Sequence, residues 1–208
     1  MLKQSTLIAL ASCSLLAPSV TASDRLNEAL NTIVEPVTLN NPPSPESVAP
    51  VAEAPKYPIV CGNCSKEEEL VLNALQDQGI TDRHALAVIM GNIRQESKFD
   101  SIVCEGGRRT GYHGCHRGGF GLIQFTSAHR YHGLGKFARG NQMNPDHIQT
   151  QIQYVFTEHE WKRAEVGFKR PGKSTSYYMN HAYTWLGWGI HGNRTHYSNQ
   201  YLRLLQPA

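Results

Sequence analysis

Glu96 lies in the apolar stripe of residues 84–99, a stretch whose periodicity predicts one amphipathic helix. At about 100° per residue, Glu96 shares a face with Ile89 and Ile93, whereas basic side chains occupy the opposite face. Apolar neighbours disfavour the charged form of a carboxyl group, so we expect the pKa of Glu96 to be raised. A carboxylic acid that keeps its proton near neutral pH can protonate a leaving oxygen as a general acid. The alternative is a helix-end glutamate that turns to solvent or pairs with Arg130.

A glycine-rich segment, GGFGLIQFT at residues 118–126, combines a β-compatible run with polar side chains. Glycine permits a ligand to approach the backbone closely. Gln124 and Thr126 offer hydrogen bonds to sugar hydroxyl or acetamido groups. Such a segment occurs in tight hairpins as well as in binding sites, so alone it does not decide between them.

The two segments together resemble the lysozyme superfamily, and most closely its phage-tail lysozyme group. The pattern of that group runs Gly-Asn-Ile, Glu-Ser and Gly-x-Gly-x-x-Gln-aromatic-Thr, followed by an arginine and a long helix. The matching positions here are Gly91, Asn92, Ile93, Glu96, Ser97, Gly119, Gly121, Gln124, Phe125, Thr126 and Arg130. The resemblance covers residues 70–205 and extends to lytic transglycosylases and goose-type lysozymes. It implies an α+β fold, mostly helical with a small β-hairpin or sheet beside the helix of Glu96.

What the resemblance implies about function is a glycosidase that acts on peptidoglycan strands. Its target would be the β-1,4 bond between N-acetylmuramic acid and N-acetylglucosamine, with Glu96 as the general acid. The group usually has tryptophan where this chain has Phe125, a ring expected to line the groove, and transglycosylases place a tyrosine opposite their glutamate. The substrate contacts expected on these grounds are Gly121, Gln124, Phe125, Thr126 and Tyr183.

A second catalytic carboxylate is less clearly placed. Asp100 and Glu105 lie in the loop where related enzymes keep one, and we prefer Glu105. If Glu105 is only a surface charge, one acid must suffice. The reaction is then hydrolysis by loosely held water, or attack by the muramyl 6-hydroxyl as in a lytic transglycosylase. A non-catalytic wall-binding module with the same fold is the remaining alternative.

Composition divides the 208 residues into three parts. Residues 1–22 have a basic start, an apolar run and small residues at the end, as in a secretory signal peptide. Residues 23–60 hold seven prolines and predict a flexible tether, and the folded domain is expected over residues 61–208. The sequence LASC, ending at Cys13, also resembles a lipoprotein cleavage site. The expected location is secreted or periplasmic.

The net charge of +3 hides an acidic tether and a basic domain. A basic exported domain suits an anionic partner such as a cell wall, although charge also serves solubility. Export argues against nucleic acid, and the apolar run is too short for a membrane span. We therefore expect peptidoglycan glycan strands as the partner, no stable membrane insertion, and a monomer. Basic residues expected to attract the wall are Arg108, Arg109 and Arg130.

An insertion that departs from the family pattern separates the two motifs. Cys104 and Cys115 bracket it, and an even number of cysteines after the signal favours disulfides, so we expect these two to pair. Cys61 would then pair with Cys64, although crossed pairings remain possible. The histidines near Cys115 could suggest zinc, but an oxidising compartment and the lack of a His-Glu-x-x-His pattern argue against it. We expect neither a metal nor another cofactor.

Helical patterns dominate the domain. Ser65 and Glu68 form a capping box that begins the first helix, and Thr81 or Asp82 caps the helix of Glu96. The remaining predicted helices are a long one, opened by Asn144 and Pro145 and including residues 148–161, and two more at residues 174–189 and 193–205.

Overall fold

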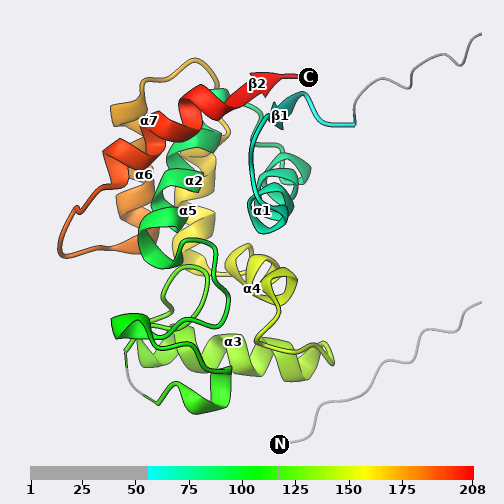
Figure 1. Ribbon diagram of the computed structural model, residues 1–208, viewed down its shortest axis with the longest axis vertical. Coiled ribbons are helices and arrows are strands. Elements are labelled where there is room, and N and C mark those ends of the chain that lie inside the picture. The colour runs from blue at the N-terminus through cyan, green and yellow to red at the C-terminus, as the bar shows by residue number, and fades with distance from the viewer. Residues whose placement is uncertain (1–55, 117) are drawn as a thin grey trace, which may run out of the picture. The chain divides into compact units, whose positions relative to one another are not determined.

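The computed structural model describes residues 56–116 and 118–208, whose helices and strands are drawn in Figure 1. The predicted signal peptide and most of the predicted tether lie outside the described residues. The α-helices are α1 (Lys66–Asp77), α2 (Arg83–Ser97), α3 (Ala128–Gly140), α4 (Ile148–Val155), α5 (His159–Phe168), α6 (Thr175–Leu186) and α7 (Arg194–Leu204). The strands are β1 (Ile59–Cys61) and β2 (Leu205–Pro207), and two 3₁₀ turns are η1 (Glu105–Gly107) and η2 (Tyr112–Gly114).

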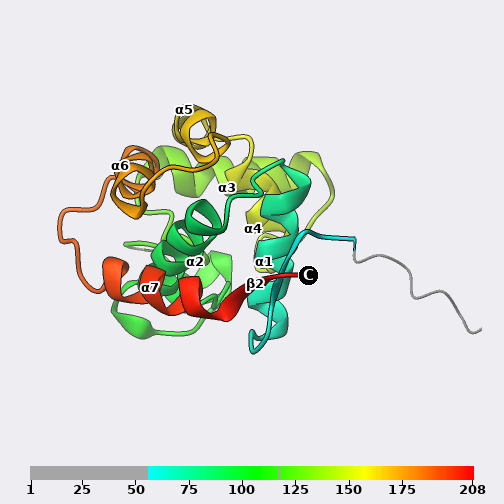
Figure 2. The same cartoon turned by 90° about the horizontal axis from the view of Figure 1, so that it is seen from above.

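The helix that carries Glu96, α2, is the central element of the helical majority. Every residue from Ala85 to Ile93 is buried, as expected of a helix covered on all sides. Figure 2 shows α2 in the middle of the helices, where it packs mainly against α7 and also against α6 and α1. Gly91 makes this close packing possible, because a Cβ there would stand 2.4 Å from the backbone nitrogen of Ser198. No helix in the described residues combines the length and apolar character that a membrane span needs.

Local capping determines where α1 and α2 begin. The predicted capping box of α1 is confirmed: Ser65 accepts from the Glu68 backbone, and Glu68 accepts from the Ser65 backbone. Of the two predicted caps for α2, the structure uses Asp82, whose carboxylate accepts from two backbone amides of the first turn. α2 ends at Ser97, and the next residue, Lys98, caps it with a φ of 55° in the left-handed region. Glu96 therefore stands in the last turn of α2.

The α+β class is confirmed, but the small sheet is not where the β-compatible segment lies. β1 and β2 pair antiparallel, with Ile59 opposite Pro207, and so join the two ends of the domain. β1 begins within the last residues assigned to the tether, where Ile59 is buried.

The predicted strand in residues 118–126 is wrong, because the segment bends into turns. Gly121 and Gln124 both have positive φ, 68° and 51°, and the Phe125 amide donates to the Phe120 carbonyl at 2.9 Å. Among the described residues, this segment forms one isolated antiparallel β-bridge, between Phe120 and Cys104. The segment still lies beside the end of α2, because the Ser97 hydroxyl donates to the Leu122 carbonyl at 2.8 Å.

The long helix predicted at residues 148–161 is divided into α4 and α5. The break falls between Val155 and His159, and Glu158 in the break has extended backbone. The carboxylate of Glu158 accepts two hydrogen bonds from Arg130, at 2.8 and 2.6 Å. The break thus directs the buried carboxylate of Glu158 toward Arg130 of α3. The continuous helical pattern of the sequence does not reveal this break.

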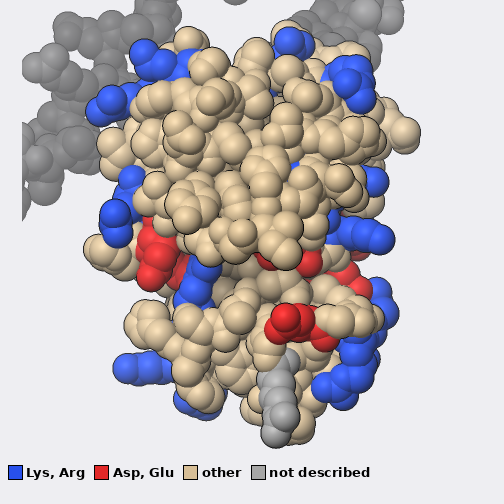
Figure 3. All heavy atoms as spheres, turned by 90° about the vertical axis from the view of Figure 1, so that its left-hand side faces the viewer, with Lys and Arg blue, Asp and Glu red and all other residues tan. Residues whose placement is uncertain are grey.

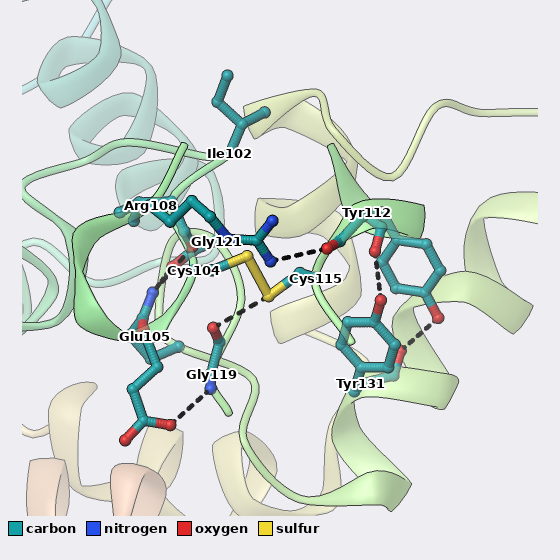
Figure 4. Close-up of a disulfide and its surroundings, with 12 residues drawn as sticks. Ile102, Cys104, Glu105, Arg108, Tyr112, Cys115, Gly119, Gly121 and Tyr131 are labelled. Carbon is teal, nitrogen blue, oxygen red and sulfur yellow. Dashed lines mark hydrogen bonds between the residues drawn. A yellow bond between two sulfur atoms is a disulfide. The ribbon is translucent and has the colours of Figure 1, made fainter. Parts of the chain in front are cut away.

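Both predicted disulfides are confirmed, Cys61 with Cys64 and Cys104 with Cys115. Figure 4 shows the second one, which links the two ends of the segment from Cys104 to Cys115. The insertion is also attached to α3 by Tyr112 and Tyr131, whose rings stack with centroids 4.3 Å apart, and each hydroxyl donates to the carbonyl of the other.

Candidate active site

The carboxyl group of Glu96 is paired with an arginine from the far end of the sequence. Nη2 of Arg194, the first residue of α7, donates to Oε1 of Glu96 at 2.6 Å. The Glu96 side chain is 16 % exposed and that of Arg194 is 5 % exposed. Among the described residues, no side chain or backbone group donates a hydrogen bond to the other oxygen, Oε2 of Glu96. One carboxylate oxygen is thus fixed, and the other remains able to contact a ligand.

Arg194 is itself held from two sides. Its Nη1 donates to Oδ1 of Asn92 at 3.2 Å, and its guanidinium carbon lies 4.4 Å from the ring centroid of Trp188. Asn92 is oriented in turn by donating to the Val88 carbonyl one turn earlier in α2, at 2.8 Å. These contacts give each residue of the Gly-Asn motif a structural role. Gly91 allows α7 to pack closely on α2, and Asn92 positions Arg194, the first residue of α7.

The environment of Glu96 acts on its proton in two opposing ways. Burial raises the pKa of Glu96, whereas the charge and hydrogen bond of Arg194 and the charge of Arg130 lower it. The pKa remains above its ordinary value, as the apolar stripe predicts. The alternative pairing with Arg130 is not formed, because Arg130 hydrogen-bonds to Glu158 instead.

Two cavities meet at Glu96. One of about 640 Å³ extends toward the α6–α7 loop, and one of about 520 Å³ extends toward η1. Glu96 and Gln124 line both, so the two form one cleft on either side of the acid. Figure 3 shows a hollow crossing this face of the molecule, with acidic and basic atoms along it. The other residues of the larger cavity are Ile123, Thr126, Ser127, Arg130, Leu186, Gly187, Trp188, Gly189, Ile190 and Arg194.

Two of the predicted substrate contacts, Gln124 and Thr126, line this cleft. The Gln124 amide donates to the carbonyls of Val103 and Gly121, at 3.2 and 3.0 Å, which fixes its side chain at the junction of the cavities. Thr126 is exposed, and its hydroxyl donates to the Gln124 carbonyl at 2.7 Å. Both therefore present polar atoms to the cleft from a firmly held turn.

Gly121 and Phe125, also predicted as substrate contacts, are buried and line neither cavity of the cleft. Gly121 is buried, and a Cβ there would stand 2.4 Å from Oε1 of Gln151, which accepts from the Leu122 amide at 2.7 Å. The glycine lets the buried Gln151 amide bond the turn closely. Phe125 is 0 % exposed and packs on Tyr154 in the core, with a centroid distance of 5.4 Å.

Tyr183 does not face Glu96 across the cleft. It is 55 % exposed and lines a separate cavity of about 580 Å³ on the other side of Trp188. The two rings are in contact, with centroids 5.1 Å apart.

Glu105 and Asp100 both line the smaller cavity of the cleft, beside Glu96. Asp100 is ion-paired with Arg109 and also accepts from the Ile102 amide at 3.1 Å. Glu105 is exposed and accepts from the Gly119 amide at 3.3 Å, as Figure 4 shows. Glu105 is therefore the carboxylate of the two that carries no ion pair with a described residue.

The arginines expected to attract the wall are engaged within the protein. Arg108 donates to the Gly114 carbonyl at 2.9 Å, Arg109 pairs with Asp100, and Arg130 pairs with Glu158. Arg130 nevertheless lines the cleft together with Arg194. Among residues 56–116 and 118–208, no three His, Cys, Asp or Glu side chains gather as a metal site.

Sequence reasoning did not assign a positioning role to four residues that hold the side chains and the turn of the cleft in place. They are Arg194, Asn92, Trp188 and Gln151. Asn92 belongs to the motif, but its role depends on Arg194, which stands 98 residues beyond Glu96. The available signal was a polar residue on the apolar face of a predicted helix. Asn92 and Gln151 are both fully buried, and buried polar groups need hydrogen-bond partners.

A protein-family model described as phage tail lysozyme matches residues 66–198, more than half of the 208 residues. The matched interval runs from the start of α1 into α7 and includes Glu96, Gln124 and Arg194. No curated protein and no solved structure matches the chain.

Proposed function

Because the chain belongs to the phage tail lysozyme family, we propose that it is an exported glycosidase that cleaves peptidoglycan. The proposed target is the β-1,4 bond between N-acetylmuramic acid and N-acetylglucosamine, and Glu96 is the general acid. The observation that carries this proposal is the position of Glu96, a largely buried carboxyl group shared by both halves of the cleft. The two disulfides are consistent with a secreted or periplasmic location.

In this mechanism the proton moves from Glu96 to the glycosidic oxygen as the bond from that oxygen to the muramyl C1 breaks. Burial raises the pKa of Glu96, which favours the protonated form that the step requires. Arg194 then stabilises the carboxylate left behind, through its charge and its 2.6 Å hydrogen bond. Oε2, which has no donor among the described residues, is the oxygen we assign to substrate.

The nucleophile that attacks C1 distinguishes two candidate reactions. In hydrolysis it is water, and we assign to Glu105, which lines the smaller cavity, the role of orienting this water and accepting its proton. In transglycosylation it is the muramyl 6-hydroxyl, whose proton returns to Glu96, and no second carboxylate is needed. The exposure of Glu105 and the ion pair of Asp100 favour keeping this second reaction as a candidate.

The proposal is tested by the loss of turbidity of purified cell wall. Glu96→Gln keeps the size of the side chain but removes its proton, so lysis should fall by a factor on the order of 10²–10⁴. Glu69→Gln, on the exposed first turn of α1, is the matched control and should lyse like the wild type. Equal lysis by Glu96→Gln and wild type would remove Glu96 from the mechanism. Wild-type protein that binds wall without releasing fragments would instead be a non-catalytic binding module.

Product masses and Glu105→Gln separate the two reactions. Hydrolysis gives reducing ends and a large loss of lysis in Glu105→Gln, whereas transglycosylation gives 1,6-anhydro ends and little loss. Reducing ends with full activity in Glu105→Gln would indicate water that no second carboxylate orients.

A further inference from the structure

The cavity on the far side of Trp188 is lined differently from the cleft. Its residues, which we call the α6–α7 cavity, are Thr175, Ser176, Met179, Asn180, Tyr183, Trp188, His191, Thr195 and Asn199. None of these is Asp, Glu, Lys or Arg, whereas the cleft is lined by Glu96, Arg130 and Arg194. Aromatic rings, hydroxyls and amides are the groups that remain.

Trp188 joins the α6–α7 cavity to the cleft, because it lines both. One neighbour of its ring is the guanidinium of Arg194, on the catalytic side. Tyr183 meets the ring edge to face at a centroid distance of 5.1 Å, and His191 does so at 5.9 Å. A chain that leaves the cleft across Trp188 therefore enters a hollow walled by aromatic rings.

Tyr183 is unusual in its exposure. It is one of four large hydrophobic residues of the described chain that are classed as exposed. Its ring is held against Trp188, so its orientation is preorganised although more than half of its surface faces solvent. A fixed ring beside amides and hydroxyls is suited to a ligand that has apolar faces and polar edges.

We propose that the α6–α7 cavity binds an uncharged saccharide unit of the same glycan strand that the cleft holds. The continuity through Trp188 supports the strand as the occupant, and this identity rests on the proposed function. Pyranose rings have apolar faces that stack on Tyr183, and their hydroxyl and acetamido groups hydrogen-bond to Asn180 and Asn199. The stem peptides of the wall carry carboxylates and amines, for which this lining offers no Asp, Glu, Lys or Arg partner.

The test measures binding separately from cleavage. In the full chain with Glu96→Gln, the affinity for peptide-free glycan strands is compared with and without Tyr183→Ala. Loss of one stacked ring should weaken binding about tenfold. Tyr183→Phe keeps the ring and should bind within about twofold of the parent, a change of less than 0.5 kcal/mol. Val166→Ala, an exposed apolar residue outside all three cavities, is the control for general surface effects and should leave affinity unchanged.

Three outcomes would overturn the inference. Equal affinity of the Tyr183→Ala protein would remove Tyr183 from binding. An equal loss in Val166→Ala would assign the effect to the surface in general. Binding only to strands that retain stem peptides would make the peptide the occupant.

Activity provides a second readout that keeps this inference distinct from the proposed function. With Glu96 intact, Tyr183→Ala should raise KM for long strands and leave kcat unchanged, because the residue contacts substrate away from the reacting bond. A fall in kcat with unchanged KM would contradict a remote binding role. Failure of the wild type to cleave wall would reject the proposed glycosidase, whereas the binding comparison would still report on Tyr183.

Discussion

Two buried glutamate–arginine pairs, Glu96 with Arg194 and Glu158 with Arg130, use the same components. In each pair the guanidinium donates to the carboxylate and lies against an aromatic ring, Trp188 at 4.4 Å and Phe125 at 5.8 Å. In each pair burial raises the pKa of the carboxyl group, and the arginine opposes that rise. Composition and electrostatics alone would not tell which pair is suited to the proposed acid catalysis.

The pairs differ in how completely the carboxylate is used. Glu158 accepts from Arg130 with both oxygens, at 2.8 and 2.6 Å, and its side chain is 2 % exposed. Glu96 accepts from Arg194 with one oxygen and is 16 % exposed, on the wall of the cleft. The pair of Glu158 and Arg130 joins α3 to the break between α4 and α5. The pair of Glu96 and Arg194 leaves one carboxylate oxygen within reach of a ligand in the cleft.

The largest expected effect is on stability, and it should separate the two pairs. Glu158→Gln leaves the buried Arg130, which cannot lose its proton, without a counterion, so the free energy of unfolding should fall by about 3–5 kcal/mol. Glu96→Gln should lower it less, by about 1–3 kcal/mol. Arg194 is also buried, at 5 % exposed, but the Glu96 side chain is 16 % exposed to the cleft, and Nη1 of Arg194 keeps its hydrogen bond to Asn92. Denaturant unfolding of both variants measures the two changes. Similar losses would mean that the Glu96 pair is as structural as the other.

The next effect is on the pH dependence of lysis. The charge of Arg194 lowers the pKa of Glu96, so Arg194→Met should raise that pKa. Because the proposed mechanism requires the protonated form of Glu96, the alkaline limb of the activity profile should then move to higher pH. Arg203→Met removes the same charge from the exposed side of α7 and should leave the limb where it is. If the alkaline limb does not move in Arg194→Met, it reflects the titration of a group other than Glu96.

The parts of the site that sequence reasoning found are those with local causes. The periodicity of α2 and the capping at Ser65 and Asp82 depend on residues a few positions apart. Glu96 was detectable because its own helix supplies the apolar face that surrounds it. The pairing of Cys104 with Cys115 likewise follows from their proximity in the chain.

The parts that were missed or misplaced depend on tertiary contacts. Arg194 reaches Glu96 because α2 and α7 cross at Gly91, and no pattern within α7 marks its first residue as a partner of α2. The ring of Phe125 was expected in the groove, but positive φ at the preceding Gln124 turns the chain so that this ring enters the core. Sequence reasoning singled out Glu96 and the segment beside it, whereas the tertiary fold determines which side chains line the cleft.

The smallest expected effect concerns how Arg194 is held. Asn92→Ala removes the side-chain acceptor of Nη1 and leaves it the longer bond to the backbone carbonyl of residue 92, at 3.5 Å. The lost hydrogen bond has a net worth of about 1 kcal/mol, so lysis should fall about fivefold. A loosened Arg194 opposes the raised pKa of Glu96 less well, so the alkaline limb should also move to higher pH, by less than in Arg194→Met. Asn141→Ala is the control, because its side-chain amide also donates to the carbonyl four residues earlier but does not hydrogen-bond to an arginine side chain. A fall in lysis at all pH values without movement of the limb would make Asn92 a purely structural residue of the α2 core.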